Sequence, residues 1–255
     1  MEQSSLSSRQ FGCAAEKYLE SPVHARGKDL ERLSDIVSTS KYRKVLDLGC
    51  GAGHAAYSVA KWCETTACDI PDGMLEIVSR ESKKRDLDIE TVRAQAESLP
   101  FEDESFCLTV TRYSAHHWFD IGKALSEAFR VTKRGGRMIV IDSVSPEFPL
   151  YDTVIQTIEL LRDASHVRNY RVSEWKRMLE NAGFGKIESD CWKVRIDFES
   201  WIGRLGTSHG RVSALKEAFM GLPKEAKAYF NIGDDLSFDL DVAWISAEKE
   251  RNEGT

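Results

Sequence analysis

A glycine-rich turn between a predicted strand and a predicted helix constrains the fold of this chain more than any other feature. The stretch KVLDLGCGAGHAAYSVAK, residues 44–61, has glycine at positions 49, 51 and 53, between an apolar run and a helical pattern. Glycine at this density weakens both elements, because it has no side chain to pack and loses more conformational freedom on folding than other residues. The turn therefore predicts a place where a ligand approaches the main chain.

The alternation of strand and helix continues along the chain. Amphipathic stretches at residues 73–85 and 121–133 are typical of helices, and we expect Gly135-Gly136 to end the second one as a left-handed cap. Short apolar runs between these stretches are typical of strands, namely residues 44–48, 64–70, 89–95, 105–114 and 137–143. Strands that alternate with helices predict a parallel sheet covered on both faces.

The flanking segments predict helices outside this core. The apolar residues between positions 10 and 20 recur at the spacing of one helical face, which predicts a helix. Ser21-Pro22 separates it from a second helix that runs to about Val37. A proline-flanked helix without a following strand lies in residues 145–170, and a further helix stops at Gly183. A strand, two amphipathic helices between Glu199 and Phe230 and a last strand complete the chain.

The pattern predicts a single α/β domain whose core is large enough to be stable alone, since the chain has 255 residues. We divide it into an N-terminal helical cap, a cofactor-binding core, a lid insertion with its following helix, and C-terminal strands with a helical insertion. These parts are expected at residues 1–40, 41–143, 144–183 and 184–255, respectively.

Composition excludes several classes of protein. The hydrophobic content of 42% and the charged content of 30% are typical of a soluble globular chain. No apolar run approaches the roughly 18 residues of a membrane span, and the start lacks the pattern of a secretion signal, so we expect a cytoplasmic protein. The net charge of −6 disfavours nucleic acid as the main partner. The six cysteines show no metal-ligand spacing, so we expect no metal.

The residues of the turn discriminate between possible ligands. A phosphate-binding loop needs a Lys-Ser/Thr pair after its last glycine, where this chain has His54-Ala55. A dinucleotide site prefers a further glycine at the position of His54. Residues 45–60 contain the acid Asp47 and neither lysine nor arginine, which suits a ligand with an ammonium and a sulfonium better than a pyrophosphate. S-adenosylmethionine carries those two cations and one carboxylate.

A carboxylate at the end of the second strand supports a nucleoside ligand. Asp69, in ACDIPDGML, stands about 20 residues after the turn, where a ribose needs an acceptor for its two hydroxyl groups. NAD also contains a ribose, so Asp69 alone does not separate S-adenosylmethionine from NAD.

With these motifs, residues 44–142 resemble class I S-adenosylmethionine-dependent methyltransferases, of the type of the C-methyltransferases of ubiquinone and menaquinone biosynthesis (methyltransferase type 11). The matching motifs are LDLGCGAG, ACDIPDGML, RAQAESLPFED, TRYSAHHW and GGRMIVID, in the order in which the family has them. The resemblance implies a Rossmann-like, seven-stranded, mostly parallel sheet with an antiparallel C-terminal hairpin, helices on both faces, an N-terminal helical cap and a helical lid. It also implies S-adenosyl-L-methionine as the cofactor.

The resemblance implies a role for each matched position. Asp47 would be oriented toward the amino group of the cofactor, Asp69 would hold the ribose, and Arg112 would face the methionine moiety. The remaining cofactor contacts would come from the main chain of the turn, from an adenine site and from the N-terminal helices, at Gly49, Gly51, Ile70, Met74, Ala96 and Tyr18. Gln95 stands where the family usually has Asp, and its amide oxygen can still accept a hydrogen bond from the adenine amino group.

Candidate catalytic residues follow the fourth and fifth strands, because ligands bind at the carboxyl ends of parallel strands. His116 and His117 are adjacent, so we expect at most one of them to act as a base, and Asp142 could orient the substrate or take a proton. Packing or turn formation explains each of these residues about equally well. Tyr113, His166 and Arg168 are the candidate substrate contacts, the last two in a charged cluster that could equally be a solvated network.

The acceptor is expected to be a small molecule with a carbon, oxygen or nitrogen nucleophile. The chain has Arg112-Tyr113-Ser114-Ala115 where enzymes that methylate nucleobase amines have an (Asn/Asp)-Pro-Pro-aromatic motif, and it contains no Pro-Cys dipeptide. Two other functions stay open: binding of S-adenosylmethionine or its demethylated product without catalysis, and NAD-dependent oxidation. The C-terminal helices could also support a homodimer.

Overall fold

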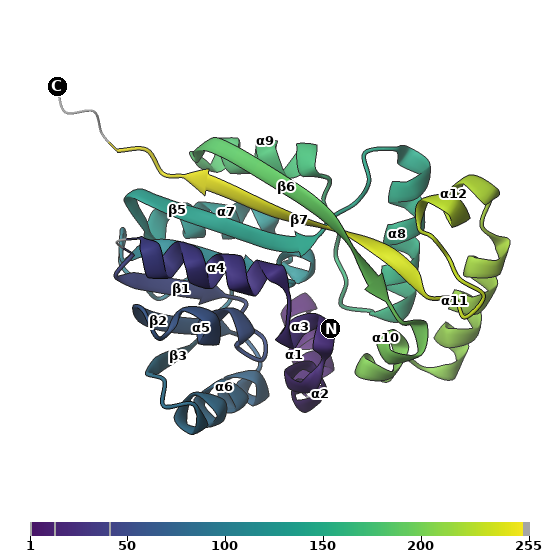
Figure 1. The fold of residues 1–255 in the computed structure, drawn as a ribbon, viewed down its shortest axis with the longest axis horizontal. Helices are drawn as coiled ribbons and strands as arrows, with labels where there is room; N and C mark the ends of the chain where they lie inside the picture. Colours follow the sequence, from purple (N-terminus) through teal and green to yellow (C-terminus); the bar gives the residue numbers. More distant parts are fainter. Residues whose placement is uncertain (1, 13, 41, 252–255) are drawn as a thin grey trace.

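The computed structural model describes residues 2–12, 14–40 and 42–251, and this part of the chain contains a seven-stranded sheet with helices on both faces (Figure 1). The strand order is β3-β2-β1-β4-β5-β7-β6. The strands are β1 (Lys44–Leu48), β2 (Glu64–Asp69), β3 (Ile89–Arg93), β4 (Phe106–Arg112), β5 (Thr132–Ser143), β6 (Gly185–Ile196) and β7 (Phe238–Glu248).

The direction of the strands confirms the predicted fold. Strands β1 to β5 pair in parallel, in the order β3, β2, β1, β4 and β5. Strand β7 is antiparallel to both β5 and β6, so β6 runs in the same direction as the first five strands. The β6–β7 pair is the antiparallel C-terminal hairpin that the motifs imply.

Helices cover the sheet because each presents apolar residues at helical spacing. In α7 (Ile121–Val131), the buried residues have the spacing of one helical face, which packs against β5 and the neighbouring helix α9 (Val172–Ala182); they are Ala124, Leu125, Ala128 and Val131. Leu30, Leu33 and Val37 of α4 lie with α5 on the other face. These helices are α4 (Lys28–Thr39), α5 (His54–Val59), α6 (Asp72–Lys84), α7 (Ile121–Val131) and α9 (Val172–Ala182).

In the part of the chain that the structure describes, three short helices precede α4 and form the N-terminal cap. They are α1 (Gln3–Gly12), α2 (Ala15–Glu20) and α3 (Pro22–Ala25). The single helix predicted at residues 10–20 is therefore wrong, since α1 ends at Gly12 and α2 begins at Ala15. The second predicted helix is also divided, because Gly27 has a φ of 156° between α3 and α4.

The predicted cap at Gly135-Gly136 is wrong as well. Helix α7 ends at Val131, and Thr132 already pairs with Phe106 as the first residue of β5. The amide and the hydroxyl of Thr132 both donate to the carbonyl of Ala128, the hydroxyl at 2.6 Å, so the helix closes at this residue without a glycine cap. Both glycines consequently belong to the start of strand β5.

A second hydrophobic core lies beyond the sheet. It contains α8 (Pro149–Arg162), α10 (Phe198–Leu205), α11 (His209–Gly221), α12 (Lys224–Tyr229) and the adjoining ends of β6 and β7. In the described residues, three helices rather than the predicted two lie between β6 and β7. Figure 1 shows the two long strands reaching from the sheet into this helical group.

Candidate active site

The glycine turn lies at the carboxyl end of β1 and exposes its main chain at Gly51. Gly49 and Gly51 have φ values of 70° and 50°, which side chains other than glycine rarely adopt. A Cβ atom added at Gly49 would lie 2.0 Å from Ser114 Oγ, whereas one added at Gly51 would meet no atom within 4 Å. Packing thus accounts for Gly49, and Gly51 faces open space.

That space is a cavity of about 550 Å³, a size typical of small-molecule and cofactor sites. The ends of β1, β2 and β4, the segment after β3 and the N-terminal cap form its walls. Eleven of the residues predicted from the sequence line it: Tyr18, Gly49, Gly51, Asp69, Ile70, Met74, Gln95, Ala96, Arg112, Tyr113 and His117. Five predicted residues lie outside this lining: Asp47, His116, Asp142, His166 and Arg168.

Asp69 lies at the end of β2 with its carboxylate against the turn. Its two oxygens accept hydrogen bonds from the amides of Gly51 at 2.6 Å and Ile70 at 2.7 Å. Burial raises the pKa of Asp69, and the two amides counteract this effect. A carboxylate can accept about four hydrogen bonds, so Asp69 retains capacity for two hydroxyl donors.

Asp47 lies behind the turn and is 1% exposed. One carboxylate oxygen accepts from the amide of Ala56 at 2.9 Å, and the other has no hydrogen-bond partner in the described part of the chain. Burial raises the pKa of Asp47 to about 7, against the opposing effect of the Ala56 amide. A buried oxygen without a donor is costly, and a cationic ligand or a bridging water at the turn would satisfy it.

A belt of five rings forms one wall of the cavity. Successive edge-to-face contacts connect His117 to Phe11 at 4.7 Å between ring centroids, and Phe11 to Tyr18 at 5.4 Å. Tyr18 contacts His24 at 4.9 Å, and His24 contacts Tyr113 at 5.5 Å. All five residues line the cavity. Aromatic faces carry partial negative charge, so the belt suits a cation or a flat ligand.

Arg112 lines the cavity but directs its polar atoms to the N-terminal helices. Its Nε donates to Asp29 at 2.5 Å, and the other two nitrogens point to the carbonyls of His24 at 2.8 Å and Val23 at 3.5 Å. The side chains of Arg112 and Asp29 are each 5% exposed. Arg112 therefore joins β4 to the cap, in addition to any contact with a ligand.

The two adjacent histidines have opposite environments. His116 Nδ1 lies 2.6 Å from Asp142, and although burial disfavours its charged form, the carboxylate outweighs this and raises the pKa of His116. Burial and the neighbouring His116 lower the pKa of His117 to about 4. His116 and Asp142 are paired with each other outside the cavity lining, and His117 is the imidazole that reaches the cavity.

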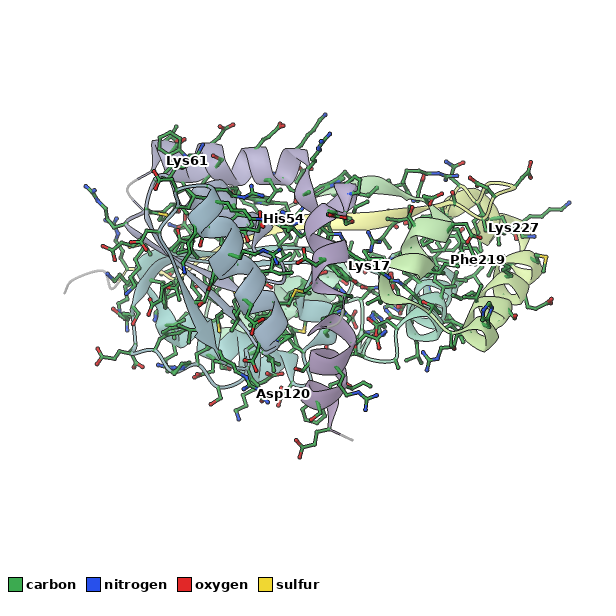
Figure 2. All side chains as sticks on the ribbon, turned by 90° about the horizontal axis from the view of Figure 1, so that it is seen from below. Lys17, His54, Lys61, Asp120, Phe219 and Lys227 are labelled. Atoms are coloured by element: carbon green, nitrogen blue, oxygen red, sulfur yellow. The ribbon has the colours of Figure 1, made fainter. Side chains whose placement is uncertain are left out.

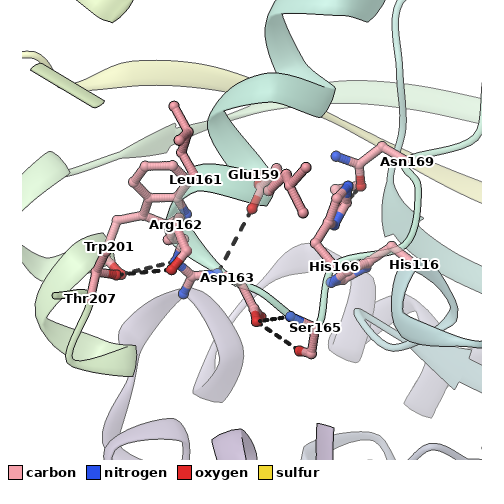
Figure 3. Close-up of polar contacts among 12 residues, drawn as sticks. His116, Glu159, Leu161, Arg162, Asp163, Ser165, His166, Asn169, Trp201 and Thr207 are labelled. Carbon is pink, nitrogen blue, oxygen red and sulfur yellow. Dashed lines mark hydrogen bonds and ion pairs between the residues drawn. The ribbon is translucent and has the colours of Figure 1, made fainter. Parts of the chain in front are cut away.

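The loop after α8 holds His117 from the other side, through Ser165. Figure 3 shows Ser165 in this loop and its two contacts with Asp163. His117 Nδ1 lies 3.2 Å from the carbonyl of Ser165, and the Asp163 carboxylate accepts from the amide and hydroxyl of Ser165. The other oxygen of Asp163 lies 3.9 Å from His117 Nε2 and has no hydrogen-bond partner among the described residues.

The two predicted substrate contacts of the lid point elsewhere. His166 Nε2 lies 3.2 Å from the Gln156 side chain, and burial lowers the pKa of His166 to about 2. Arg168 forms ion pairs with Asp152 at 3.3 Å and Glu174 at 3.2 Å. Both residues therefore contribute to a charged network that fixes the loop, beside the cavity wall rather than in it.

Sequence reasoning missed His24, His54 and Glu97, which also line the cavity. His54 follows the turn directly. In the sequence, it served only to distinguish the turn from a phosphate-binding loop and from a dinucleotide motif, and it did not predict a residue of the cavity wall. His24 comes from a separate cap helix, and no spacing in the sequence connects it to the turn.

The glycine turn after β1, the acid at the end of β2 and the reversed strand β7 between β5 and β6 define a Rossmann-like methyltransferase. A family model described as a methyltransferase domain matches residues 46–140. The uncharacterized methyltransferase YcgJ of Bacillus subtilis is 34% identical over 248 residues, which cover 94% of this chain and 97% of the relative. This chain belongs to the S-adenosylmethionine-dependent methyltransferases.

Other comparisons agree with this assignment. The crystal structure of YcgJ superposes with a TM-score of 0.81 and 31% identity, covering 87% of this chain and 99% of that one. The uncharacterized protein YafE of Escherichia coli is 39% identical over 184 residues, 72% of this chain and 89% of the relative. The ubiquinone/menaquinone biosynthesis C-methyltransferase UbiE of Rhizobium etli is 36% identical over 181 residues, 65% of this chain and 70% of the relative.

In the ranges that the structure describes, no helix has both the length and the apolar character needed to cross a membrane.

Proposed function

We propose that this chain binds S-adenosyl-L-methionine in the cavity at the glycine turn and transfers its methyl group to a small-molecule acceptor in the cytoplasm. The observation that carries the proposal is the open main chain at Gly51, whose amide contacts Asp69 at 2.6 Å. A ribose seated on Asp69 brings the rest of the cofactor along this turn. The cofactor is a cation at its sulfonium, and the turn contains neither lysine nor arginine.

The residues present fit each part of this cofactor. Asp69 would accept from the ribose hydroxyls, and the unpartnered oxygen of Asp47, which lies behind the turn, would accept from the amino group, directly or through water. Ile70 and Met74 would enclose the adenine, and Gln95 and Ala96 would contact its polar edge. These four residues line the same cavity as Gly51 and Asp69, which supports one continuous site.

Methyl transfer depends mainly on orientation and on the state of the nucleophile. When bound, the cofactor supplies an electrophilic methyl group on a sulfonium. The ring belt from His117 to Tyr113 excludes water from the acceptor side and orients a flat acceptor. His117 donates its Nδ1 hydrogen to Ser165, which leaves the Nε2 lone pair for a proton from the acceptor. Asp163, 3.9 Å away, stabilises the imidazolium so formed.

The acceptor is a small molecule with a carbon, oxygen or nitrogen nucleophile. The net charge of −6 and the absence of the nucleobase-methylating motifs support this class over nucleic acid. Self-association to a homodimer remains a prediction.

Calorimetry with purified protein tests the cofactor assignment. We expect S-adenosylmethionine and its demethylated product to bind with micromolar affinity and NAD to show no binding at millimolar concentration. An acceptor panel analysed by mass spectrometry for methylated product then tests turnover. Protein that retains NAD and ignores S-adenosylmethionine would contradict the proposal.

Replacing His117 by alanine is expected to slow turnover by about a hundredfold, the lower end of the range for loss of a general base. Binding of S-adenosylhomocysteine should change less than threefold, because His117 is on the acceptor side of the belt. The exposed His209 provides a matched control, His209→Ala, which should leave both quantities unchanged. An unaltered rate in His117→Ala would place the base elsewhere.

A further inference from the structure

His54 occupies a position between the glycine turn and the N-terminal cap. It is the first residue of α5, directly after Gly53, and its side chain lines the same cavity as Gly51 and Asp69. Its Nε2 lies 3.2 Å from the carbonyl oxygen of Tyr18 in α2. Figure 2 shows His54 beside the purple helices of the cap.

The Tyr18 carbonyl needs a donor from outside its own helix. In a continuing helix it would accept from the amide four residues later, but position 22 is proline, which has no amide hydrogen. Ser21 has already left the helical conformation, with φ −62° and ψ 118°. The helix therefore has no amide at position 22 to donate to the Tyr18 carbonyl, and His54 of α5 donates to it instead.

Two of the other polar contacts that hold α2 are exposed, and a third, between Arg162 Nη2 and the Tyr18 hydroxyl at 3.5 Å, is partly buried. Glu16 and Arg80 form an ion pair whose side chains are 60% and 45% exposed, and Lys17 donates to the carbonyl of Gly203 at the surface. Exposed pairs of this kind contribute little to stability. The contact from His54 is partly buried and lies at the cavity itself.

We propose that His54 is a positioning residue for cofactor binding, because its Nε2–H holds cap helix α2, and with it the ring of Tyr18, over the cavity. The inference rests on the cofactor site proposed above. Tyr18 is the middle ring of the belt, so a shift of its main chain moves the contacts to both Phe11 and His24. His54 acts through Tyr18 and needs no contact with the reacting atoms.

A neutral imidazole suits this position better than a cationic donor. Burial lowers the pKa of His54 to about 4, although the Tyr18 carbonyl partly opposes this. The ring therefore donates one hydrogen bond without adding a positive charge beside a cofactor that is itself cationic at its sulfonium. A lysine at this position would donate equally well and would repel that charge.

Two variants of matched size separate the hydrogen bond from the volume of the side chain. His54→Leu fills the space without a donor, and His54→Gln retains an N–H at nearly the same reach. We expect His54→Leu to release S-adenosylhomocysteine about tenfold faster in stopped-flow dissociation, and His54→Gln to remain within threefold of the wild type. Equal release rates in both variants, fast or unchanged, would overturn the proposal.

Hydrogen exchange without any ligand gives an independent measurement. Amides of residues 15–25 should exchange faster in His54→Leu than in the wild type and at the wild-type rate in His54→Gln, while the amides of β4 stay equally protected in all three. Unchanged exchange at residues 15–25 in His54→Leu would contradict the cap-holding role. A wild-type protein that binds no S-adenosylhomocysteine would contradict the proposed function, and the exchange result would still decide the role of His54.

Discussion

Asp69→Ala should weaken binding of S-adenosylmethionine by at least tenfold, or about 1.4 kcal/mol. The carboxylate retains free acceptor capacity beside its bonds to Gly51 and Ile70, and two ribose hydroxyls would use it. Hydrogen bonds to a charged group are worth more than neutral ones, so tenfold is the lower bound. Calorimetric titration with S-adenosylhomocysteine, the unreactive product, measures the effect without turnover.

Asp69→Asn is the matched control for this experiment. It retains one oxygen for the Gly51 amide and loses the charge, so its affinity should fall between those of the wild type and Asp69→Ala. A thermal unfolding scan of each variant shows whether the turn itself is intact. If a folded Asp69→Ala bound the product with wild-type affinity, the ribose would have to lie elsewhere.

The Asp47→Asn variant should gain stability over the wild type as the pH rises, so that the difference between their free energies of unfolding grows from pH 4.5 to pH 7.5. Burial raises the pKa of Asp47 to about 7 in the folded protein, whereas the value in an unfolded chain is about 3.9. Between these pH values Asp47 keeps its proton in the folded state and has lost it in the unfolded state. The free energy of unfolding of the wild type therefore falls as the pH rises. The asparagine stays neutral and keeps an oxygen for the Ala56 amide.

The expected gain of the variant over this window is about 2–4 kcal/mol in the free energy of unfolding, at about 1.4 kcal/mol for each pKa unit. Urea unfolding at several pH values measures it as the difference between variant and wild type, which cancels the contributions of the buried histidines. The exposed Asp234→Asn is the control and should show no such slope. A difference independent of pH would mean that Asp47 is ionised throughout.

The strands and the part of the cavity at the glycine turn could be predicted because their signals are local. Alternation of strand and helix predicts a parallel sheet, and parallel strands bring their carboxyl ends to one edge. This places Gly51, at the end of β1, next to Asp69, at the end of β2, without further information. The identity of the glycines and the lack of basic residues around them then indicate the kind of ligand.

Helix ends were predicted less well because they depend on competing partners. Gly135-Gly136 is typical of a helix cap, but pairing of Thr132 with Phe106 starts the strand earlier. The direction of the Arg112 side chain could not be predicted for the same reason. Its donors are occupied by Asp29 and by the carbonyl of His24, which are more than 80 residues away in the chain. Hydrogen-bond competition of this kind is not visible in a single segment.

The wall formed by the ring belt required the tertiary structure. His116 and His117 are equivalent in the sequence, but contact with Asp142 raises the pKa of His116, whereas burial lowers the pKa of His117. Phe11, Tyr18 and His24 become one wall only when the cap folds back over the turn.

By itself, the sequence determined the sheet, the glycine turn and the acids beside it, because backbone preferences and the pattern of apolar residues act over a few neighbouring positions. Only the tertiary structure decided which histidine faces the cavity, where Arg112 points and what holds the cap. The physical reason is that burial and charge pairing depend on groups that are distant in the chain and meet only after folding.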